Sequence, residues 1–142
     1  MKIQNKGYRG YIFSREINNQ YTSQKIQNMT IRDYAKKNNL FFLLSATEYK
    51  MKGSFFILNS IFSDLKDITG IIFFSLFQLP IDKTSRNKIY KLILFNKLTV
   101  HFASEDIVLK NEEDISIIEL YLFINKNSKS AILNLDSTFK HF

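Results

Sequence analysis

Polar side chains follow several apolar runs of this sequence, at the positions where an α/β protein places its chemistry. Ser14 and Arg15 follow the first run, Gln78 follows the third, and Glu105 and Asp106 follow the last. Ser14 could act as a nucleophile, and the planar donor fork of Arg15 suits a phosphate or a carboxylate. Glu105 or Asp106 could supply a general base to the same crevice. The same residue types also serve as turn residues, helix caps and solvated surface charges, so both interpretations stay open.

Two further groups of polar residues are candidates for ligand binding. Lys50 and Lys52 stand in a segment that we expect to be a loop, where they could bind an anion or could be ordinary solvated lysines. Gln20, Gln24 and Gln27 could donate amide hydrogen bonds to a polar ligand such as a sugar. They could equally form the exposed face of the first helix.

Thiol chemistry and cysteine-rich or histidine-rich metal sites are excluded by composition. The chain has no cysteine and only two histidines, His101 and His141. Thiolate nucleophiles, disulfides, cysteine zinc sites and a histidine-rich metal site therefore cannot form. His101 stands inside an expected strand, where a lone histidine is more often a hydrogen-bonded core residue than a catalyst. We expect no metal and no cofactor.

The net charge of +7 is unevenly distributed along the chain. Residues 1–97 hold 16 Lys and Arg against 6 Asp and Glu, a balance of +10, whereas residues 98–142 hold 4 against 7, a balance of −3. A basic body can attract nucleic acid, anionic lipid or sugar phosphates. A solvated surface rich in Lys and Asn explains the same count, and we favour that explanation.

Apolar runs and helical spacing alternate along the chain and predict one α/β domain. Strands are expected at 9–14, 40–46, 71–76 and 98–103, and helices at about 22–38, from 54, from Thr84 or Ser85, and at about 112–124. This alternation predicts a three-layer domain with a mostly parallel sheet of four to five strands and helices on both faces. Ile72 and Phe74 are expected in a strand that is covered on both faces.

The domain is expected to span 1–142, with its core at about 8–125 and a less regular tail at 126–142. A short strand or helix is expected at about 131–135. The first helix should bury Ile26, Met29 or Thr30, Tyr34 and Ala35, and the third should bury Ile89, Leu92 and Ile93. Ligands of such sheets meet the carboxyl ends of the strands, beside the point where the strand order reverses.

Membrane insertion and secretion are not indicated. The longest apolar runs are far shorter than the roughly 20 residues that a spanning helix needs. The first ten residues, MKIQNKGYRG, lack the apolar core of a signal peptide. We expect a cytoplasmic protein.

The order of several short motifs resembles the catalytic domain of serine recombinases, the resolvases and invertases. The chain has a Gly-Tyr pair in the first strand, Gln27 seven residues before Tyr34-Ala35, then SAT, a helix and GIIFFSLFQLP. The resemblance covers about residues 10–124 and implies a resolvase-like fold of the Rossmann or flavodoxin type.

The residues that would carry recombinase catalysis are replaced. Against the family pattern GYxRVS, the catalytic arginine falls on Phe13 and the nucleophilic serine on Arg15, with Ser14 one residue early. Against LDRLxR, the acid and the two arginines fall on Phe77, Gln78 and Ile81. Stabilising the charge of the phosphoryl group is most of phosphoryl-transfer catalysis. We therefore expect that this protein is not an active serine recombinase.

A second resemblance is to the sporadic carbohydrate cluster proteins, small bacterial proteins of surface polysaccharide gene clusters. It rests on GYIFSREINNQYTSQKIQNMTIRDYAKKNNL, LLSATEYKMKGSFFILNSI, GIIFFSLFQLP and HFASEDI. The resemblance implies a role in surface carbohydrate synthesis but no particular activity or residue role.

Three classes of function remain open, in this order. The first is a non-catalytic interaction or regulatory module that binds a protein of a polysaccharide pathway or assembles as a homo-oligomer. The second is an enzyme acting on an anionic sugar, a sugar phosphate or a nucleotide sugar, with a site rebuilt from the strand-end residues. The third, which we disfavour, is a nucleic-acid binder that uses the basic first two thirds of the chain.

Overall fold

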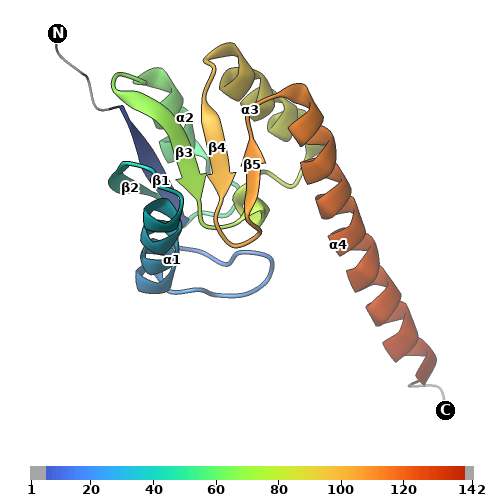
Figure 1. Cartoon of the computed structure of the whole chain (residues 1–142). Helices are drawn as coiled ribbons and strands as arrows, with labels where there is room; N and C mark the ends of the chain where they lie inside the picture. Colours follow the sequence, from blue (N-terminus) through green and yellow to red (C-terminus); the bar gives the residue numbers. More distant parts are fainter. Residues whose placement is uncertain (1–5, 140–142) are drawn as a thin grey trace, which may run out of the picture.

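The computed structural model describes the backbone of residues 6–139 and the side chains of residues 6–128. Strands and helices alternate along the chain (Figure 1). The elements are β1 (Gly7–Phe13), α1 (Gln24–Lys37), β2 (Phe42–Glu48), α2 (Phe56–Ser63), β3 (Ile68–Phe73), the 3-10 turn η1 (Leu76–Gln78), α3 (Lys83–Phe95), β4 (Thr99–Phe102), β5 (Ile107–Leu109) and α4 (Glu112–Phe139).

The strands form one five-stranded sheet in the order β2-β1-β3-β4-β5. The first four strands are parallel, and β5 runs antiparallel to β4. In register, Gly10 pairs with Ile72 and Ile72 pairs with His101, so these strands end close together at one edge. The strand order reverses between β1 and β3, and this places the expected ligand crevice at their carboxyl ends.

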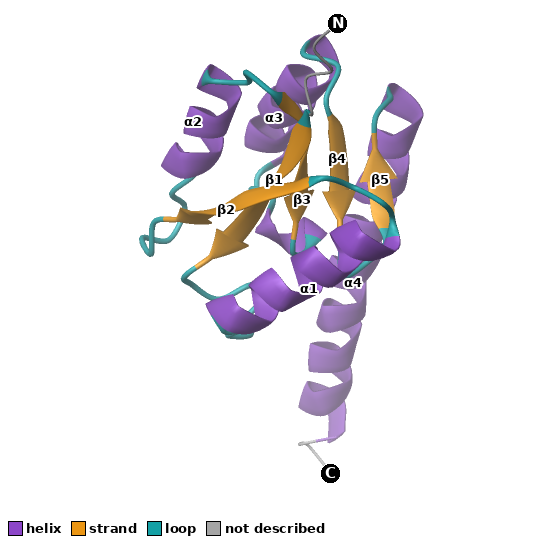
Figure 2. Ribbon diagram, turned by 60° about the vertical axis from the view of Figure 1, so that its left-hand side comes forward, coloured by secondary structure: helices purple, strands orange, loops and turns teal. Residues whose placement is uncertain are grey.

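Helices cover both faces of the sheet and complete three layers (Figure 2). On one face, Ile31, Tyr34 and Ala35 of α1 pack against Ile12 and Ile72. On the other face, α2, α3 and the first turns of α4 cover the central strands. That second cluster includes Leu58, Ile61, Ile89, Ile93 and Ile118 from the helices, with Tyr11, Ile71, Phe73, Val100 and Phe102 from the strands. The predicted three-layer α/β architecture is confirmed.

Several predicted boundaries were wrong. β3 ends at Phe73, so Phe74 lies outside the strand and is only half-buried, because the chain turns at once into η1. β5 has three residues, too few for a periodic signal. Ser23 caps α1, and α3 begins at Lys83 behind an Asp82 cap, before the predicted start.

Apolar spacing also misjudged which side chains face inward. Ile26 and Met29 are each 54% exposed, and Leu92 is exposed as well. Gln27 occupies the buried position in the first turn of α1, so its apolar neighbours Ile26 and Met29 face the solvent. The sequence periodicity does not show this, because a polar residue fills the inner position.

The last helix is far longer than predicted. α4 continues to Phe139 instead of ending near residue 124, and the segment at 131–135 lies within it. The stretch NKNSKS is polar but contains neither Gly nor Pro, so nothing in it terminates a helix. In Figure 1 the carboxyl-terminal half of α4 extends beyond the sheet and its covering helices. Among residues 6–139, no helix has both the length and the apolar content to span a bilayer.

The neighbouring phenylalanines of β3 and its exit provide a stability test. Phe73 is fully buried, and its ring lies 4.9 Å from Tyr11 and 5.1 Å from Phe102 between ring centroids. We predict that Phe73→Ala lowers the free energy of unfolding by about 3–5 kcal/mol, measured by chemical denaturation. Phe74→Ala is the matched control and should cost clearly less, because Phe74 is half-buried. Equal losses at the two positions would contradict the assigned burial.

Candidate functional site

The carboxyl ends of β1, β3 and β4 bring five of the predicted site residues to one edge of the sheet. Ser14 and Arg15 follow β1, Gln78 closes the turn after β3, and Glu105 and Asp106 lie between β4 and β5. Because these strands are parallel neighbours, their ends converge. Whether these side chains are free to bind a ligand or to react depends on what each of them already contacts.

Ser14 and Arg15 both bind the chain that leaves β2. Ser14 Oγ donates to the Glu48 carbonyl at 3.0 Å. Arg15 Nη1 donates to the carbonyls of Tyr49 and Met51 at 2.9 and 3.1 Å. The Arg15 guanidinium also stacks 4.0 Å above the centroid of the Phe13 ring. In this structure the two residues hold the loop after β2 in place through its backbone carbonyls.

Gln78 is fully buried and both ends of its amide are used. Its Nε2 donates to the Tyr11 carbonyl at 3.1 Å, and its Oε1 accepts from the Ser75 amide at 3.0 Å. The Ser75 hydroxyl in turn accepts from the Phe77 amide and forms a capping box with Gln78. Gln78 thus fastens η1 to the central strand instead of offering its amide to a ligand.

Glu105 closes the same turn from the β4 side. Its carboxylate accepts from the Leu76 amide and from Ser75 Oγ, each at 2.8 Å. Burial raises the pKa of Glu105 above its ordinary value, although these hydrogen bonds oppose the shift. Asp106 is exposed and has φ of 55°, in the left-handed region that a tight turn requires. Only Asp106 of this pair faces water freely.

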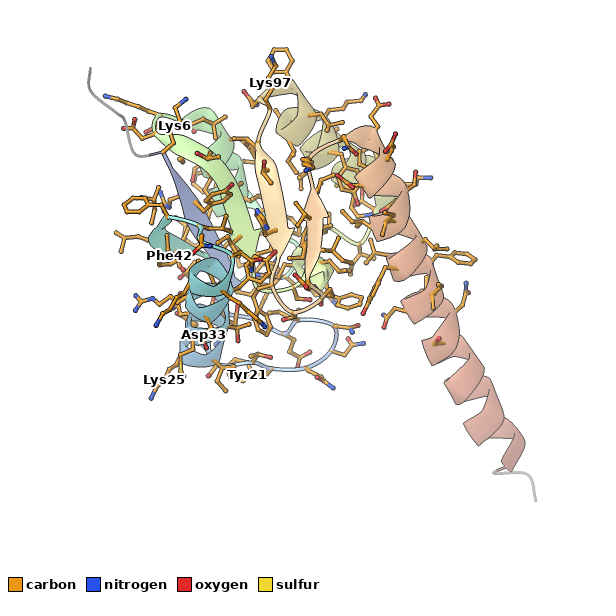
Figure 3. The ribbon with its side chains drawn as sticks, in the orientation of Figure 1. Lys6, Tyr21, Lys25, Asp33, Phe42 and Lys97 are labelled. Atoms are coloured by element: carbon orange, nitrogen blue, oxygen red, sulfur yellow. The ribbon has the colours of Figure 1, made fainter. Side chains whose placement is uncertain are left out.

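Of the other candidates, Gln27 is fully buried, whereas Gln20, Gln24, Lys50 and Lys52 are exposed. Gln20 closes a small turn through two backbone hydrogen bonds with Ile17, of 2.8 and 3.0 Å. Lys50 and Lys52 lie in the loop between β2 and α2. Basic residues do not gather on one edge: Figure 3 shows Lys6 and Lys97 at one end of the molecule and Lys25 at the other. Two surface grooves, of about 390 and 340 Å³, contain none of the predicted site residues.

Glu48 is the polar residue that sequence reasoning did not single out. It is 1% exposed and its carboxylate accepts five hydrogen bonds. The donors are Tyr11 Oη, the Tyr49 amide, Ser54 Oγ and the Ile57 and Leu58 amides, at 2.8 to 3.3 Å. Burial alone would raise the pKa of Glu48, but the hydrogen bonds outweigh it and hold the pKa below its ordinary value. Its signal in the sequence is an acid at a strand end shortly before a helix.

Gln27 and His101 are the other buried polar residues of interest. Gln27 binds both the amide and the carbonyl of Phe13 at 2.8 Å, so it joins α1 to the end of β1. His101 lies in the core, as expected, and its Nδ1 is 2.8 Å from Tyr34 Oη. Burial lowers the pKa of His101. Its Nε2 is buried and has no hydrogen-bond partner among the described residues.

The positions that correspond to recombinase catalytic residues carry no phosphate-binding cluster. Phe77 contacts Tyr121 with ring centroids 6.1 Å apart, and Ile81 is 90% exposed. Over the described part of the chain, no group of three or more His, Asp or Glu residues is placed to hold a metal ion. The edge therefore offers hydrogen-bonded structural polar groups and apolar surface.

Comparisons with known proteins identify the fold. No protein-family model and no curated protein matches the sequence. The structure is similar to a resolvase family site-specific recombinase from Streptococcus pneumoniae, with a TM-score of 0.58 and 13% identity over 94% of this chain and 97% of the other. It is also similar to the N-terminal catalytic domain of TP901-1 integrase, with a TM-score of 0.54 and 14% identity over 87% and 98% of the two chains. The chain has a resolvase-catalytic-domain-like α/β fold.

The two buried glutamates should respond oppositely to pH. The folded-state pKa of Glu48 is depressed, so its stabilisation is present above the unfolded value of about 4.3 and is lost as the pH falls through the folded value. Glu48→Gln should cost about 2–4 kcal/mol of unfolding free energy at pH 7, because at least two donors lose a charged acceptor. The difference from wild type should shrink at acid pH, as measured by urea unfolding across a pH series.

Glu105→Gln is the matched control for that experiment. The pKa of Glu105 is raised, so ionisation of its carboxylate weakens folding as the pH rises through the shifted value. The neutral amide should therefore become more favourable relative to wild type as the pH rises from about 4 to 7. Parallel pH profiles for the two variants would show that the carboxylates do not differ as assigned.

Proposed function

We propose that this protein is a non-catalytic interaction module, in which a recombinase-like fold serves as a platform for protein association in surface carbohydrate synthesis. The observation that supports it most is the use of the strand-end polar groups. Gln78 and Glu105 are tied to backbone and hydroxyl groups of η1, and Ser14 to the Glu48 carbonyl. The carbohydrate context comes from the sequence resemblance alone.

The surface that we assign to association is the apolar face of α4. It consists of five exposed side chains, Ile117, Leu120, Tyr121, Phe123 and Ile124, which are 43 to 64% exposed. Ile118 of the same helix is buried in the core of the domain, so the first half of α4 is apolar both where it packs on the domain and where it is exposed. Exposed apolar clusters of this kind mark interaction sites in soluble domains.

The root of α4 is fixed on the domain, which presents this face in a defined direction. Arg86 of α3 binds the Glu119 carboxylate with two hydrogen bonds of 2.8 and 2.9 Å, and Tyr90 Oη donates to the same carboxylate at 2.8 Å. Arg86 Nη1 also binds the Pro80 and Ile81 carbonyls, so the loop after η1 is held beside α4.

A second copy of this chain fits the apolar face of α4. A helix of 28 residues is about 42 Å long, enough for an extended helix–helix contact. Antiparallel pairing of two copies, centred at the level of residue 119, would oppose Ile117 of one copy and Tyr121 of the other.

The association is tested by the molecular mass in solution, from light scattering during size-exclusion chromatography. We predict a dimer for the wild type and a monomer for the double variant Leu120→Glu/Ile124→Glu, since burial of carboxylates in an apolar contact is unfavourable. Asn59→Glu adds a carboxylate at an exposed position of α2 and should stay dimeric. A monomeric wild type, or a variant with unchanged mass, would refute the assigned surface.

The absence of a catalytic role is tested with ligands of the competing hypothesis. We predict that nucleotide sugars and sugar phosphates do not raise the melting temperature, whereas a ligand at 100 times its Kd would stabilise the fold by about 2.7 kcal/mol. A rise that Arg15→Lys removes, while Lys36→Gln at the exposed end of α1 retains it, would favour the enzyme hypothesis instead. The shared charge chemistry makes Lys36→Gln the control for nonspecific anion binding.

A further inference from the structure

The loop between β2 and α2 carries a second exposed apolar cluster, far along the chain from α4. Tyr49 is 50% exposed, Met51 71% and Phe56 64%. The rings of Tyr49 and Phe56 lie 5.7 Å apart between centroids, with an interplanar angle of 34°. The two rings therefore form one surface with each other, and Met51 projects from the same loop.

Positive charge is interleaved with these apolar residues. Lys50 and Lys52 are exposed and alternate with Tyr49 and Met51 along the chain. We call these four residues and Phe56 the basic–apolar loop surface. The Glu48 carboxylate is buried beneath the loop, where it accepts five hydrogen bonds, so it is not part of the exposed surface. The surface is thus both cationic and apolar.

The loop is held in its shape by the domain below it. Arg15 binds the carbonyls of Tyr49 and Met51, and the Ser54 amide donates to the Met51 carbonyl at 3.1 Å. Gly53 has φ of 82°, a conformation that lets the chain turn back toward α2. The exposed side chains are therefore presented without the entropy cost of ordering a flexible loop on binding.

We propose that the basic–apolar loop surface binds the surface of an anionic membrane. Tyr49, Met51 and Phe56 would enter the boundary between headgroups and acyl chains, and Lys50 and Lys52 would contact lipid phosphates. The charge that matches such a membrane is that of Lys50 and Lys52, which are both exposed on the loop. This mode of binding requires no spanning helix, and none is present among residues 6–139.

The arrangement favours lipid over single-stranded nucleic acid. Base stacking needs an open aromatic face, and the rings of Tyr49 and Phe56 each turn one side toward the other. The most exposed apolar side chain of the three is Met51, which has no π face to stack on a base. An acyl boundary accepts a methionine and an aromatic edge equally well.

The test is flotation of the purified protein with vesicles of phosphatidylglycerol and phosphatidylcholine, and with vesicles of phosphatidylcholine alone. We expect binding to the mixed vesicles only. Lys50→Gln/Lys52→Gln should weaken that binding by about fivefold for each lysine. Met51→Ser/Phe56→Ser should abolish most of it. Circular dichroism and thermal melting report whether each variant is folded.

Matched controls carry the same changes elsewhere on the surface. Lys36→Gln/Lys37→Gln removes two exposed lysines from the end of α1, and Phe95→Ser removes an 85% exposed phenylalanine from the end of α3. Both should retain binding. The proposal is overturned if the wild type does not float with anionic vesicles, or if the controls lose as much vesicle binding as the loop variants do. It is also overturned if neither the wild type nor the loop variants bind vesicles and the loop variants instead lose binding to an oligonucleotide.

This inference is separable from association through α4. The double variant Leu120→Glu/Ile124→Glu keeps the basic–apolar loop surface, so it should still float with anionic vesicles. A dimer holds two such loops, so the variant should bind more weakly than the wild type through loss of avidity. Molecular mass therefore reports on the α4 surface, and the flotation that the monomeric variant retains reports on the basic–apolar loop surface.

Discussion

The hydrogen bonds that the buried Glu48 carboxylate accepts are the interaction on which the sheet edge at the ends of β1 and β2 depends. Burying a carboxylate is costly unless hydrogen bonds satisfy it, and here five donors do so. Those donors come from β1, from the loop after β2 and from the first turn of α2. Phe55, at the N-cap of α2, makes no side-chain cap, so the carboxylate takes over that function and also complements the helix dipole. One side chain thereby fixes a strand end, a loop and a helix start together.

The same principle recurs at the other strand ends. Gln27 closes the junction of β1 and α1, and Gln78 with Glu105 closes the turn after β3. Each is a polar side chain that supplies hydrogen bonds to backbone groups that the sheet no longer pairs, and unpaired buried backbone groups would be unfavourable. The residues with the most chemical promise in the sequence are thus among those that the fold uses for its own closure.

The sequence could predict the elements that a local pattern marks, but not the contacts between residues that are distant along the chain. The runs GYIF and GIIFF predicted parallel strands because such strands are buried on both faces, and the matching helices followed from their spacing. The run LFFLLSA also predicted a strand, although β2 lies at the edge of the sheet and Leu44 is 77% exposed. β5 is too short to show any periodicity. The length of α4 could not be predicted, because the absence of Gly and Pro permits a helix to continue but does not require it. The partners of Glu48 and Gln78 could not be predicted. Tyr11 and Glu48 are 37 residues apart, and only the folded sheet brings them to 2.8 Å.

The turn η1 links this edge of the sheet to α4 through Phe77 and to β1 through Gln78. In the recombinase pattern, the positions of Phe77 and Gln78 carry an acid and an arginine. Here the Phe77 ring lies 6.1 Å from that of Tyr121 in α4, and Gln78 is enclosed without exposure. A carboxylate at residue 77 would face an aromatic ring instead of a cation, and a guanidinium at residue 78 would be buried where an amide now bridges Tyr11 and Ser75. The contact with Tyr121 and the closure of η1 therefore favour an apolar residue at position 77 and a neutral amide at position 78.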